Sequence, residues 1–346
     1  VGVLARVLSV FHHNKVPLTQ VSTKLLNIEP DNSQEAYFAL DFEGSRTDPN
    51  AIRALKELNF FARAYIDDEV PEVPWFPVHY SDLDRIGKVM DVSNQTGGKD
   101  HPGFNDPVYR QRRDQIAKIS TNYKMGNPIP TFDYNEDENK TWERIWNRLR
   151  PLQEKIMCKQ FNQNIKKLEE AGIYRPDRIP QLEDINQFLI KTTGFRLKPV
   201  SGILTQREFL NALALRTFCC TQYIRHYSAP EYTPEPDIIH ELLGHAPMFA
   251  DPDFADLSQQ IGILSLGNNE ENIIKLAALY WYTVEFGCCK EDGDIKGYGA
   301  GVASSIGEIE NVGKRGAEFR PLNPFKELKL DYPIQTLQPI YYVAED

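Results

Sequence analysis

Residues 233–245 read T-P-E-P-D-I-I-H-E-L-L-G-H and place two histidines, His240 and His245, five residues apart in a run that is compatible with a helix. Forty residues further on, Glu285 lies within W-Y-T-V-E-F-G, residues 281–287, where a carboxylate is surrounded by aromatic side chains. Two imidazoles and one carboxylate are the ligand set of a non-haem Fe(II) centre that leaves coordination positions open for oxygen. The pattern therefore predicts a mononuclear iron site.

The spacing of the two histidines also suggests a second class of metal site. Zinc proteases use H-E-x-x-H, in which histidines four residues apart share one face of an α-helix. Here the spacing is one residue longer, which separates the two side chains by roughly 140° in an α-helix. We therefore expect the helix to end at Gly244, with His245 returning from less regular backbone. A zinc-dependent hydrolase that uses His240, His245 and Glu241 remains the alternative from another class, and the extra residue disfavours it.

A simpler interpretation is that the three residues are unrelated. Against it, the chain has seven histidines, and two of them fall in one proline-bounded, acid-flanked segment. An unpaired carboxylate among the aromatic neighbours of Glu285 would be costly. Either a metal or an arginine partner would account for it.

Arg225 is the nearby cation, in Y-I-R-H. It would either clamp a substrate carboxylate with two parallel hydrogen bonds or pair with an acid such as Glu285 or Asp237. The sequence leaves both interpretations open. The aromatic residues around this segment would line a pocket for an aromatic ring or fill the core; they are Phe209, Tyr280, Trp281 and Phe286.

Composition limits the partners of the protein. Acidic residues outnumber basic ones, 49 to 39, which gives a net charge of −10 and disfavours nucleic acid or an anionic membrane as a partner. No apolar run approaches the ~20 residues that span a bilayer. The cysteines form no disulfide framework and no zinc pattern, so we predict a reducing, cytoplasmic location; they are Cys158, Cys219, Cys220, Cys288 and Cys289.

The length of 346 residues suggests two domains. Residues 1–70 are predicted to form a small α/β unit in the order α-β-β-α-β, residues 71–77 a linker, and residues 78–346 a mainly α domain. A strand before Val1 would complete a ferredoxin-like unit. The first expected helix has Leu4, Val7, Leu8 and Phe11 on one face, and strands are expected at 16–28 and 36–42. A second helix begins at Asp48-Pro49, with Ile52, Leu55 and Leu58 on its apolar face, and a last strand follows at 62–66.

Beyond the linker, apolar periodicity predicts long helices separated by proline-rich loops. The candidate helices span 81–92, 142–168, with a break or kink at Pro151, and 206–224.

With these residues in place, the chain resembles the pterin-dependent aromatic amino acid hydroxylases. The resemblance is close over 233–267 and 279–309, and further motifs extend it over the whole of 73–345. These motifs are V-P-W-F-P at 73–77, D-H-P-G-F at 100–104, I-P-Q-L-E-D at 179–184, G-F-R-L at 194–197 and Q-P-I-Y-Y-V at 338–343.

The resemblance implies Fe(II) bound by His240, His245 and Glu285, with O2 as co-substrate. It implies tetrahydrobiopterin or a related tetrahydropterin in front of the iron, on residues Gly202, Ile203, Leu204, Phe209, Glu241, Ala277 and Tyr280. It implies an amino acid whose carboxylate is held by Arg225, with Thr233, Gly301 and Ser304 nearby, and whose ring packs on Pro236, Trp281 and Phe286.

Two positions bear on which amino acid is hydroxylated. Trp281 matches the residue found in family members that act on phenylalanine or tyrosine. In similar members that act on tryptophan, a phenylalanine occupies this position. Ile334 lies at the position where similar, tyrosine-specific members carry an aspartate. An apolar residue there suits a ring without a hydroxyl group. Together they favour hydroxylation of L-phenylalanine to L-tyrosine. Hydroxylation of tryptophan is the alternative within the family.

The first unit is similar to the ACT regulatory domain of the same family. That likeness implies phenylalanine as an allosteric effector, bound near Gly2, Leu4 and Val21. Family members also carry a C-terminal helix that drives tetramers, and its position would fall beyond Asp346. We therefore expect a dimer or tetramer of the full-length protein.

Overall fold

The computed structural model divides the chain into two compact units, residues 1–74 and 75–346, each described here by itself. Within the described ranges, no helix combines the length and apolar character needed to cross a membrane. The structure describes residues 3–28, 34–43, 48–58, 74–87, 101–231, 233, 235–323, 332–334 and 336–345.

The first unit consists of two helices and an antiparallel strand pair. Its elements follow the predicted order, while the expected strand at 62–66 and Gly2 lie outside the described residues. The strands pair with Val21 opposite Leu40. Apolar side chains of both helices form its core, among them Phe11 and Leu58. The elements are α1 (Val3–His13), β1 (Leu18–Ile28), β2 (Gln34–Phe42) and α2 (Pro49–Leu58).

The buried face of α2 differs from the prediction. Ala51, Ala54 and Leu58 are buried, whereas Ile52 is 39% exposed. The small side chains of the two alanines face the core, where α2 packs against α1. Leu58 is buried and Leu55 packs against the same core, as predicted, so Ile52 alone departs from the expected face.

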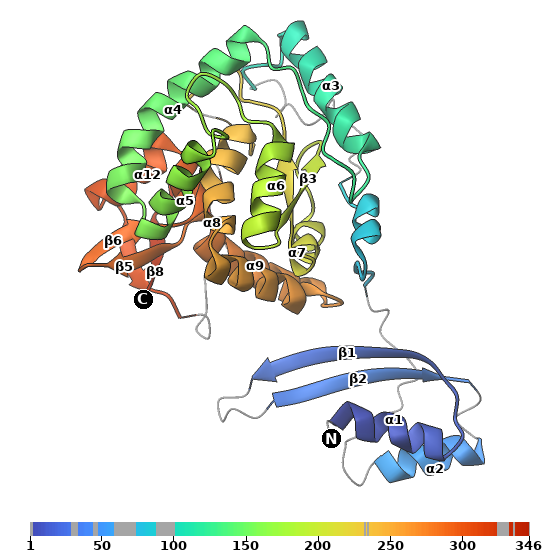
Figure 1. Cartoon of the computed structure of the whole chain (residues 1–346). Helices are drawn as coiled ribbons and strands as arrows, with labels where there is room; N and C mark the ends of the chain where they lie inside the picture. The colour runs from blue at the N-terminus through green and yellow to red at the C-terminus, as the bar shows by residue number, and fades with distance from the viewer. Residues whose placement is uncertain are drawn as a thin grey trace. The chain divides into compact units, whose positions relative to one another are not determined.

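The second unit is mostly helical, as predicted, and Figure 1 shows α4 along its outer edge. Its core contains fully buried Trp142, Phe161, Leu242 and Phe249. Its α-helices are α3 (Pro107–Asn122), α4 (Glu136–Ile156), α5 (Lys159–Glu170), α6 (Leu182–Thr192), α7 (Gln206–Ala214), α8 (Ala246–Phe249), α9 (Pro252–Ser265), α10 (Glu270–Tyr280), α11 (Ala300–Ser304) and α12 (Ile306–Lys314).

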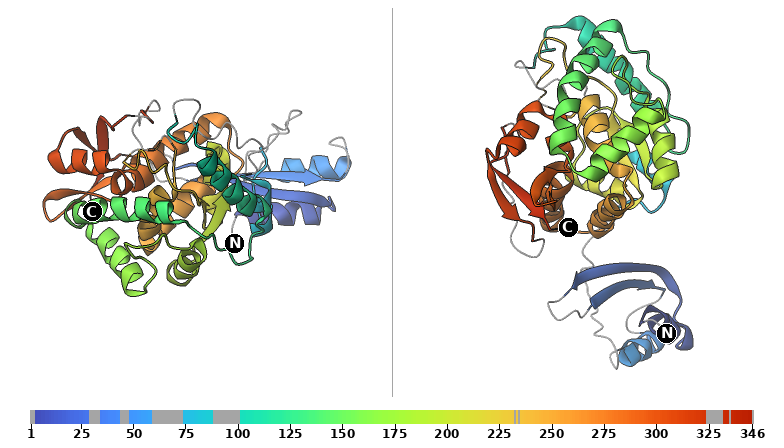
Figure 2. Two further views of the ribbon diagram at one scale, coloured as in Figure 1. Left: turned by 90° about the horizontal axis from the view of Figure 1, so that it is seen from above. Right: turned by 60° about the vertical axis from the view of Figure 1, so that its left-hand side comes forward.

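Two small sheets accompany these helices. The parallel pair β3 (Arg196–Val200) and β4 (Thr217–Thr221) lies beside α6 and α7. Figures 1 and 2 show a four-stranded sheet at one end of the unit, with the strand order β6-β5-β8-β7. Its strands are β5 (Cys288–Glu291), β6 (Asp294–Gly297), β7 (Glu318–Pro321) and β8 (Ile340–Ala344).

Three predicted helices differ from the structure. The helix predicted at 206–224 ends at Ala214, because Arg216 adopts a left-handed conformation with φ of 45° and the chain continues as β4. The helix predicted at 142–168 continues through Pro151, which lies on the exposed face, and breaks instead at Met157, between α4 and α5. In place of a helix at 81–92, a short 3-10 helix spans Tyr80–Arg85, and residues 88–92 lie outside the described part.

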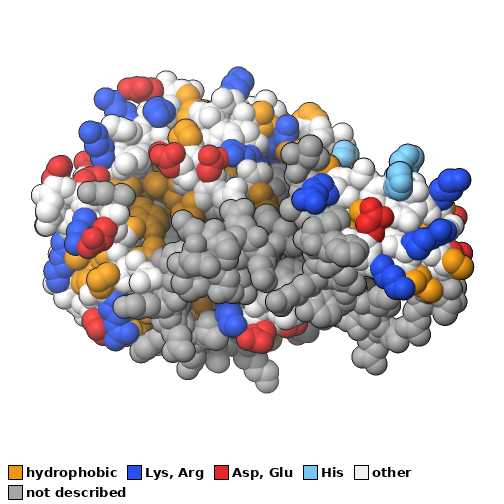
Figure 3. Space-filling model, turned by 90° about the horizontal axis from the view of Figure 1, so that it is seen from below, with side chains coloured by type: hydrophobic (Ala, Val, Ile, Leu, Met, Phe, Trp, Pro, Cys, Tyr) orange, Lys and Arg blue, Asp and Glu red, His pale blue; other side chains and the backbone are white. Residues whose placement is uncertain are grey.

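Charged side chains of both signs are interspersed on the face drawn in Figure 3. Such a mixed surface, on a chain with a net charge of −10, does not suit electrostatic steering toward a polyanion.

Candidate metal centre and active site

His240 and His245 lie at the two ends of a π-helical turn, His240–His245, which we call the first π turn. The N–H group of Ala246 donates to the carbonyl of Glu241, five residues earlier. In this geometry residues five apart become neighbours on one face. The two imidazole Nε2 atoms are accordingly 3.0 Å apart.

The prediction that the helix ends at Gly244 is wrong, because the first π turn runs directly into α8. Gly244 is required for a different reason. A Cβ atom there would lie 2.8 Å from the carbonyl oxygen of Ala300 in α11. The glycine thus allows α11 to pack directly on the turn that carries the histidines.

Glu285 lies at the end of a second π-helical turn, Trp281–Glu285, which follows α10 and which we call the second π turn. Its carboxylate oxygens are 3.0 Å from His245 Nε2 and 3.4 Å from His240 Nε2. One donor atom from each of the three residues lies within 4.8 Å of the others. The structure therefore brings together the three residues predicted to bind iron.

The donor atoms fit a metal ion. Two imidazole lone pairs facing each other at 3.0 Å repel unless a proton or a cation lies between them. Two nitrogens that bind one ion at about 2.1 Å and at right angles would be about 3.0 Å apart. The arrangement matches the two-histidine, one-carboxylate set of non-haem iron proteins.

Electrostatics favour the charged form of the carboxylate. Burial alone would raise the pKa of Glu285, but the two imidazoles beside it lower that pKa below its usual range. Burial lowers the pKa of His245. At His240 burial also acts to lower the pKa, but the charges of Glu285, Glu241 and Asp237 and the hydrogen bond to Glu285 together outweigh it and raise the pKa. The carboxylate therefore remains a charged ligand for a cation.

Ser304, predicted to lie near the substrate, contacts a histidine in the structure. Its Oγ donates to the carbonyl of Ala300 at 2.7 Å and lies 2.9 Å from His240 Nδ1. Because the hydroxyl proton is committed to Ala300, the histidine must donate from Nδ1. That tautomer leaves the lone pair of Nε2 directed at the other two ligands.

The residues predicted to contact a pterin come from three segments. Phe209 of α7 packs edge-to-face on Tyr280 of α10, with ring centroids 5.0 Å apart. The Tyr280 hydroxyl is buried and has no hydrogen-bond partner among the described residues. Ala277 is buried on α10, while in the segment before α7 Gly202 is buried, Leu204 is half-buried and Ile203 is 67% exposed.

Glu241, also predicted to contact the pterin, is buried against β4. Its Oε1 accepts hydrogen bonds from the Thr221 N–H at 3.1 Å and from the Thr221 hydroxyl at 2.9 Å. Burial raises its pKa to about 7, against the opposing charge of His240. The strand pair thus fixes this carboxylate beside the metal ligands.

The predicted ring-binding residues form a layered aromatic group. Trp281 packs on Phe286 at 4.8 Å and stacks on Tyr332 at 4.5 Å between ring centroids. Gly301 leaves room for this group, since a Cβ atom there would lie 2.5 Å from the Phe286 ring. Sequence reasoning did not identify Tyr332, which belongs to a segment without periodicity.

Arg225 forms a buried ion pair with Asp237. Its Nε and Nη2 atoms each donate to one carboxylate oxygen at 2.8 Å, and its Nη1 lies 3.4 Å from the Pro230 carbonyl. Of the two interpretations left open by the sequence, the structure contains the pairing with Asp237.

Other predicted positions lie at or near the surface. The Thr233 hydroxyl donates to the Glu235 carbonyl at 2.7 Å, and Pro236 is exposed. Ile334 is 72% exposed. In the first unit, Leu4 is half-buried on α1 and Val21 is 41% exposed on β1.

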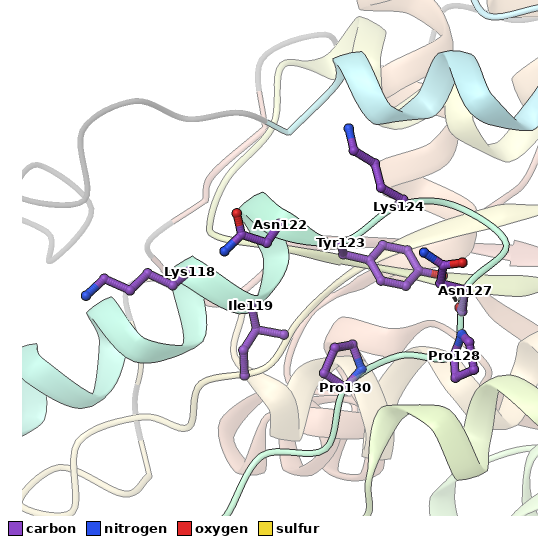
Figure 4. A pocket seen from close by; sticks show the side chains of 8 residues that line it. All are labelled: Lys118, Ile119, Asn122, Tyr123, Lys124, Asn127, Pro128 and Pro130. Carbon is purple, nitrogen blue, oxygen red and sulfur yellow. Dashed lines mark hydrogen bonds between the residues drawn. The ribbon is translucent and has the colours of Figure 1, made fainter.

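A separate cavity of about 370 Å³ lies where α3 ends (Figure 4). It contains none of the predicted site residues, and its lysine side chains point outward. We assign it no role in the chemistry. Its lining residues are Lys118, Ile119, Asn122, Tyr123, Lys124, Asn127, Pro128 and Pro130.

Comparison with known proteins agrees with this geometry. Residues 74–346 match the family of biopterin-dependent aromatic amino acid hydroxylases. Phenylalanine-4-hydroxylase of Mus musculus is 45% identical over 350 residues, which cover 100% of this chain and 76% of that protein. Tyrosine 3-monooxygenase of Drosophila melanogaster is 48% identical over 297 residues, which cover 85% of this chain and 51% of that protein.

A solved structure is similar as well. Phenylalanine hydroxylase of Chromobacterium violaceum, crystallised with bound iron(III) and 7,8-dihydrobiopterin, is 27% identical with a TM-score of 0.60. The match covers 68% of this chain and 85% of that chain. The chain therefore belongs to the biopterin-dependent aromatic amino acid hydroxylases.

Proposed function

We propose that the protein hydroxylates L-phenylalanine to L-tyrosine with O2, a tetrahydropterin and Fe(II). The observation that carries the proposal is the convergence of His240, His245 and Glu285, whose donor atoms lie within 4.8 Å of one another. Relatives named phenylalanine-4-hydroxylase, which align with the whole chain, support the choice of reaction.

In this proposal the three residues hold Fe(II), which supplies redox chemistry at its open coordination positions. Ser304 keeps the proton of His240 on Nδ1 and so leaves Nε2 free to bind. His245 is buried, and the side chains of His240 and Glu285 are only 16% and 13% exposed, which would restrict the access of bulk water to the reacting atoms.

The pterin would lie against Phe209 and Tyr280, with Ala277 and the backbone of Gly202, Ile203 and Leu204 along its edge. Thr221 fixes the carboxylate of Glu241 by two hydrogen bonds, and this orients it to accept from a pterin N–H group. The buried Tyr280 hydroxyl, beside the Glu285 carboxylate, is a second polar group that a ligand could contact.

Arg225 would bind the substrate carboxylate without leaving Asp237. A guanidinium has five N–H donors. Asp237 accepts two of them and the Pro230 carbonyl faces a third. One N–H then remains on each terminal nitrogen, which forms a fork for a second carboxylate. The two interpretations of Arg225 are compatible, since the acid positions the guanidinium for the ligand.

The substrate ring would pack on Trp281 and Phe286, near Pro236, Gly301 and Thr233. Ile334 supports phenylalanine through its apolar character and its place two residues after Tyr332, which stacks on Trp281. Ile334 itself is 72% exposed, so the argument for a bare ring rests on the packed rings of Trp281 and Phe286, which offer a substrate hydroxyl group no partner.

Product analysis tests this function. The purified chain is incubated with Fe(II), O2, tetrahydrobiopterin and each aromatic amino acid in turn. We expect the highest kcat/KM with phenylalanine, giving tyrosine. Faster turnover of tryptophan or tyrosine would overturn the substrate assignment, and zinc-dependent peptide hydrolysis without hydroxylation would overturn the reaction class.

We also infer that residues 1–70 form an ACT-like regulatory domain, joined by residues 71–77 to a catalytic domain at 78–346. The α-β-β-α order with an antiparallel strand pair supports this inference. We expect preincubation of the full chain with phenylalanine to raise its initial rate, and Val21→Arg to abolish that effect. An initial rate that is the same with and without preincubation would refute regulation by phenylalanine. Sedimentation analysis of the full-length protein would test the expected homo-oligomer.

A further inference from the structure

A proline removes one hydrogen bond from the first π turn. In π-helical geometry the N–H of each residue donates to the carbonyl five residues earlier, as Ala246 does to Glu241. The next carbonyl is that of Leu242, whose partner would be Pro247. Proline has no N–H group. Since the N–H of Ala246 is already used, this carbonyl has no backbone donor in the π-helical pattern.

The position is too deeply buried for water to replace the missing donor. Leu242 has no exposed surface, and its neighbours Leu243 and Ala246 are also buried. Buried backbone carbonyls are nearly always paired, because leaving one unpaired is unfavourable. The turn therefore needs a donor from elsewhere in the fold.

Tyr174 provides that donor from 68 residues away. Its hydroxyl donates to the carbonyl of Leu242, and its side chain is buried beside the Trp146 ring. A tight turn after α5 places the tyrosine there: Gly172 adopts a φ of 69°, and the N–H of Tyr174 donates to the Leu168 carbonyl at 3.1 Å.

Two further side chains bond the same stretch of backbone. The Nδ2 of Asn164, on α5, donates to the Pro247 carbonyl at 2.9 Å. Gln153, on α4, donates from Nε2 to the Ala303 carbonyl at 2.9 Å and lies 3.4 Å from the Leu243 carbonyl. The helices α5 and α8 pack together, as Figure 1 shows. Side chains from other segments therefore donate hydrogen bonds to backbone carbonyls in and directly after the first π turn.

We propose that Tyr174 is a positioning residue for the metal site, which acts through the Leu242 carbonyl to hold the first π turn in its five-residue register. In an α-helical register His240 and His245 would point roughly 140° apart and could not share one ion. The inference rests on the proposed function, because it assumes that these histidines bind the metal.

The test compares Co(II) binding by the full chain and by Tyr174→Phe, which removes only the hydroxyl group. We expect Tyr174→Phe to bind Co(II) about 10-fold more weakly, in the range seen when outer-shell partners of metal ligands are removed. We also expect its visible Co(II) spectrum to change. The matched control is Tyr123→Phe, because the Tyr123 hydroxyl also donates to a carbonyl, that of Asn127, at 3.0 Å. The control should bind Co(II) as the unmodified chain does.

A rescue variant separates positioning from general packing. Pro247→Ala restores the N–H group that the Leu242 carbonyl lacks, so Tyr174→Phe in that background should lose little Co(II) affinity. The proposal is overturned if Tyr174→Phe alone binds Co(II) within twofold of the unmodified chain with an unchanged spectrum. It is also overturned if Pro247→Ala gives no recovery. If the unmodified chain itself binds no Co(II), the proposed function is wrong. If the unmodified chain binds Co(II) and Tyr174→Phe binds it equally well, only the role given to Tyr174 is wrong.

Discussion

The two π turns bring the three candidate metal ligands together, but they are stabilised in different ways. The first π turn carries His240 and His245, and the carbonyl left free by Pro247 is bonded by the side chain of Tyr174. The second π turn carries Glu285 and closes with its own backbone, since the Phe286 N–H donates to the Trp281 carbonyl at 2.9 Å. The first turn depends on a distant donor, and the second depends on what packs around it.

Glycines provide that packing at the second π turn. A Cβ atom at Gly299 would lie 2.4 Å from the Glu285 carbonyl oxygen and 2.6 Å from the Gly287 nitrogen. These are backbone atoms, which cannot move away from an added Cβ atom as the end of a flexible side chain can. The comparison shows that added atoms should disturb both turns, at Gly244 in the first and at Gly299 beside the second, whereas loss of a distant side-chain donor should disturb only the first.

Removing the ligand of the second π turn should have the largest effect. We expect Glu285→Ala to weaken Fe(II) binding by more than about 100-fold, beyond the ~10–100-fold typical of outer-shell partners. The fold should persist, because the carboxylate faces the metal site and not a packed apolar neighbour. Metal titration and far-UV circular dichroism check this, with Glu143→Ala, at an exposed position of α4, as the control. A variant that loses its helical signal yet still binds iron would show that Glu285 is structural.

Adding a methyl group beside the second π turn should have the next largest effect. Gly299→Ala is expected to lower the free energy of unfolding by about 1–3 kcal/mol, as overpacking does. The matched control is Gly307→Ala, where the new Cβ atom meets the end of the Leu337 side chain at 3.0 Å. Urea unfolding of both variants measures the difference. Equal stabilities would contradict the role given to close packing.

A smaller effect is expected from the hydroxyl group that orients His240. Ser304→Ala should weaken Fe(II) binding by about 10-fold, because the imidazole loses the acceptor that fixes its tautomer. Ser258→Ala is the matched control, since its buried hydroxyl bonds to the Phe254 carbonyl at 2.8 Å. If both variants retain the same iron affinity, Ser304 does not position the ligand.

The effect that is smallest at neutral pH, and grows only in acid, concerns the segment that leads into the first π turn. Burial, together with the charge of Arg113, lowers the pKa of His101 to about 4, and its Nε2 lies 3.7 Å from Glu235. Between pH 4 and about 6.5 the unfolded chain binds a proton that the folded chain does not, so stability falls as pH falls. His101→Asn should flatten the pH dependence of unfolding in this window. If the free energy of unfolding changes with pH equally in His101→Asn and in the unmodified chain, His101 does not contribute to the pH dependence.

The sequence predicted the ligand set but not the backbone that assembles it. The identities of His240, His245 and Glu285 were visible from chemistry alone. The five-residue spacing predicts a helix end at Gly244, because residue order does not reveal whether hydrogen bonds span four residues or five. Tyr174 lies far from the histidines in sequence, so its contact with Leu242 required the folded chain.

The fold shows the same limit. Periodicity predicted a mostly helical second unit, but it missed the strand after Arg216, whose left-handed backbone ends α7. Pro151 was expected to break a helix, yet it lies on the exposed face of α4. Local patterns predict element types, whereas tertiary packing decides where elements end and which face is buried.

If the two π turns place three side chains around one iron, anomalous diffraction from crystals of the full chain loaded with Fe(II) should locate that ion. We expect one iron peak within coordination distance of His240 Nε2, His245 Nε2 and a Glu285 oxygen, with the remaining positions not filled by protein atoms. A peak elsewhere, or an iron enclosed by four or more protein side chains, would contradict it.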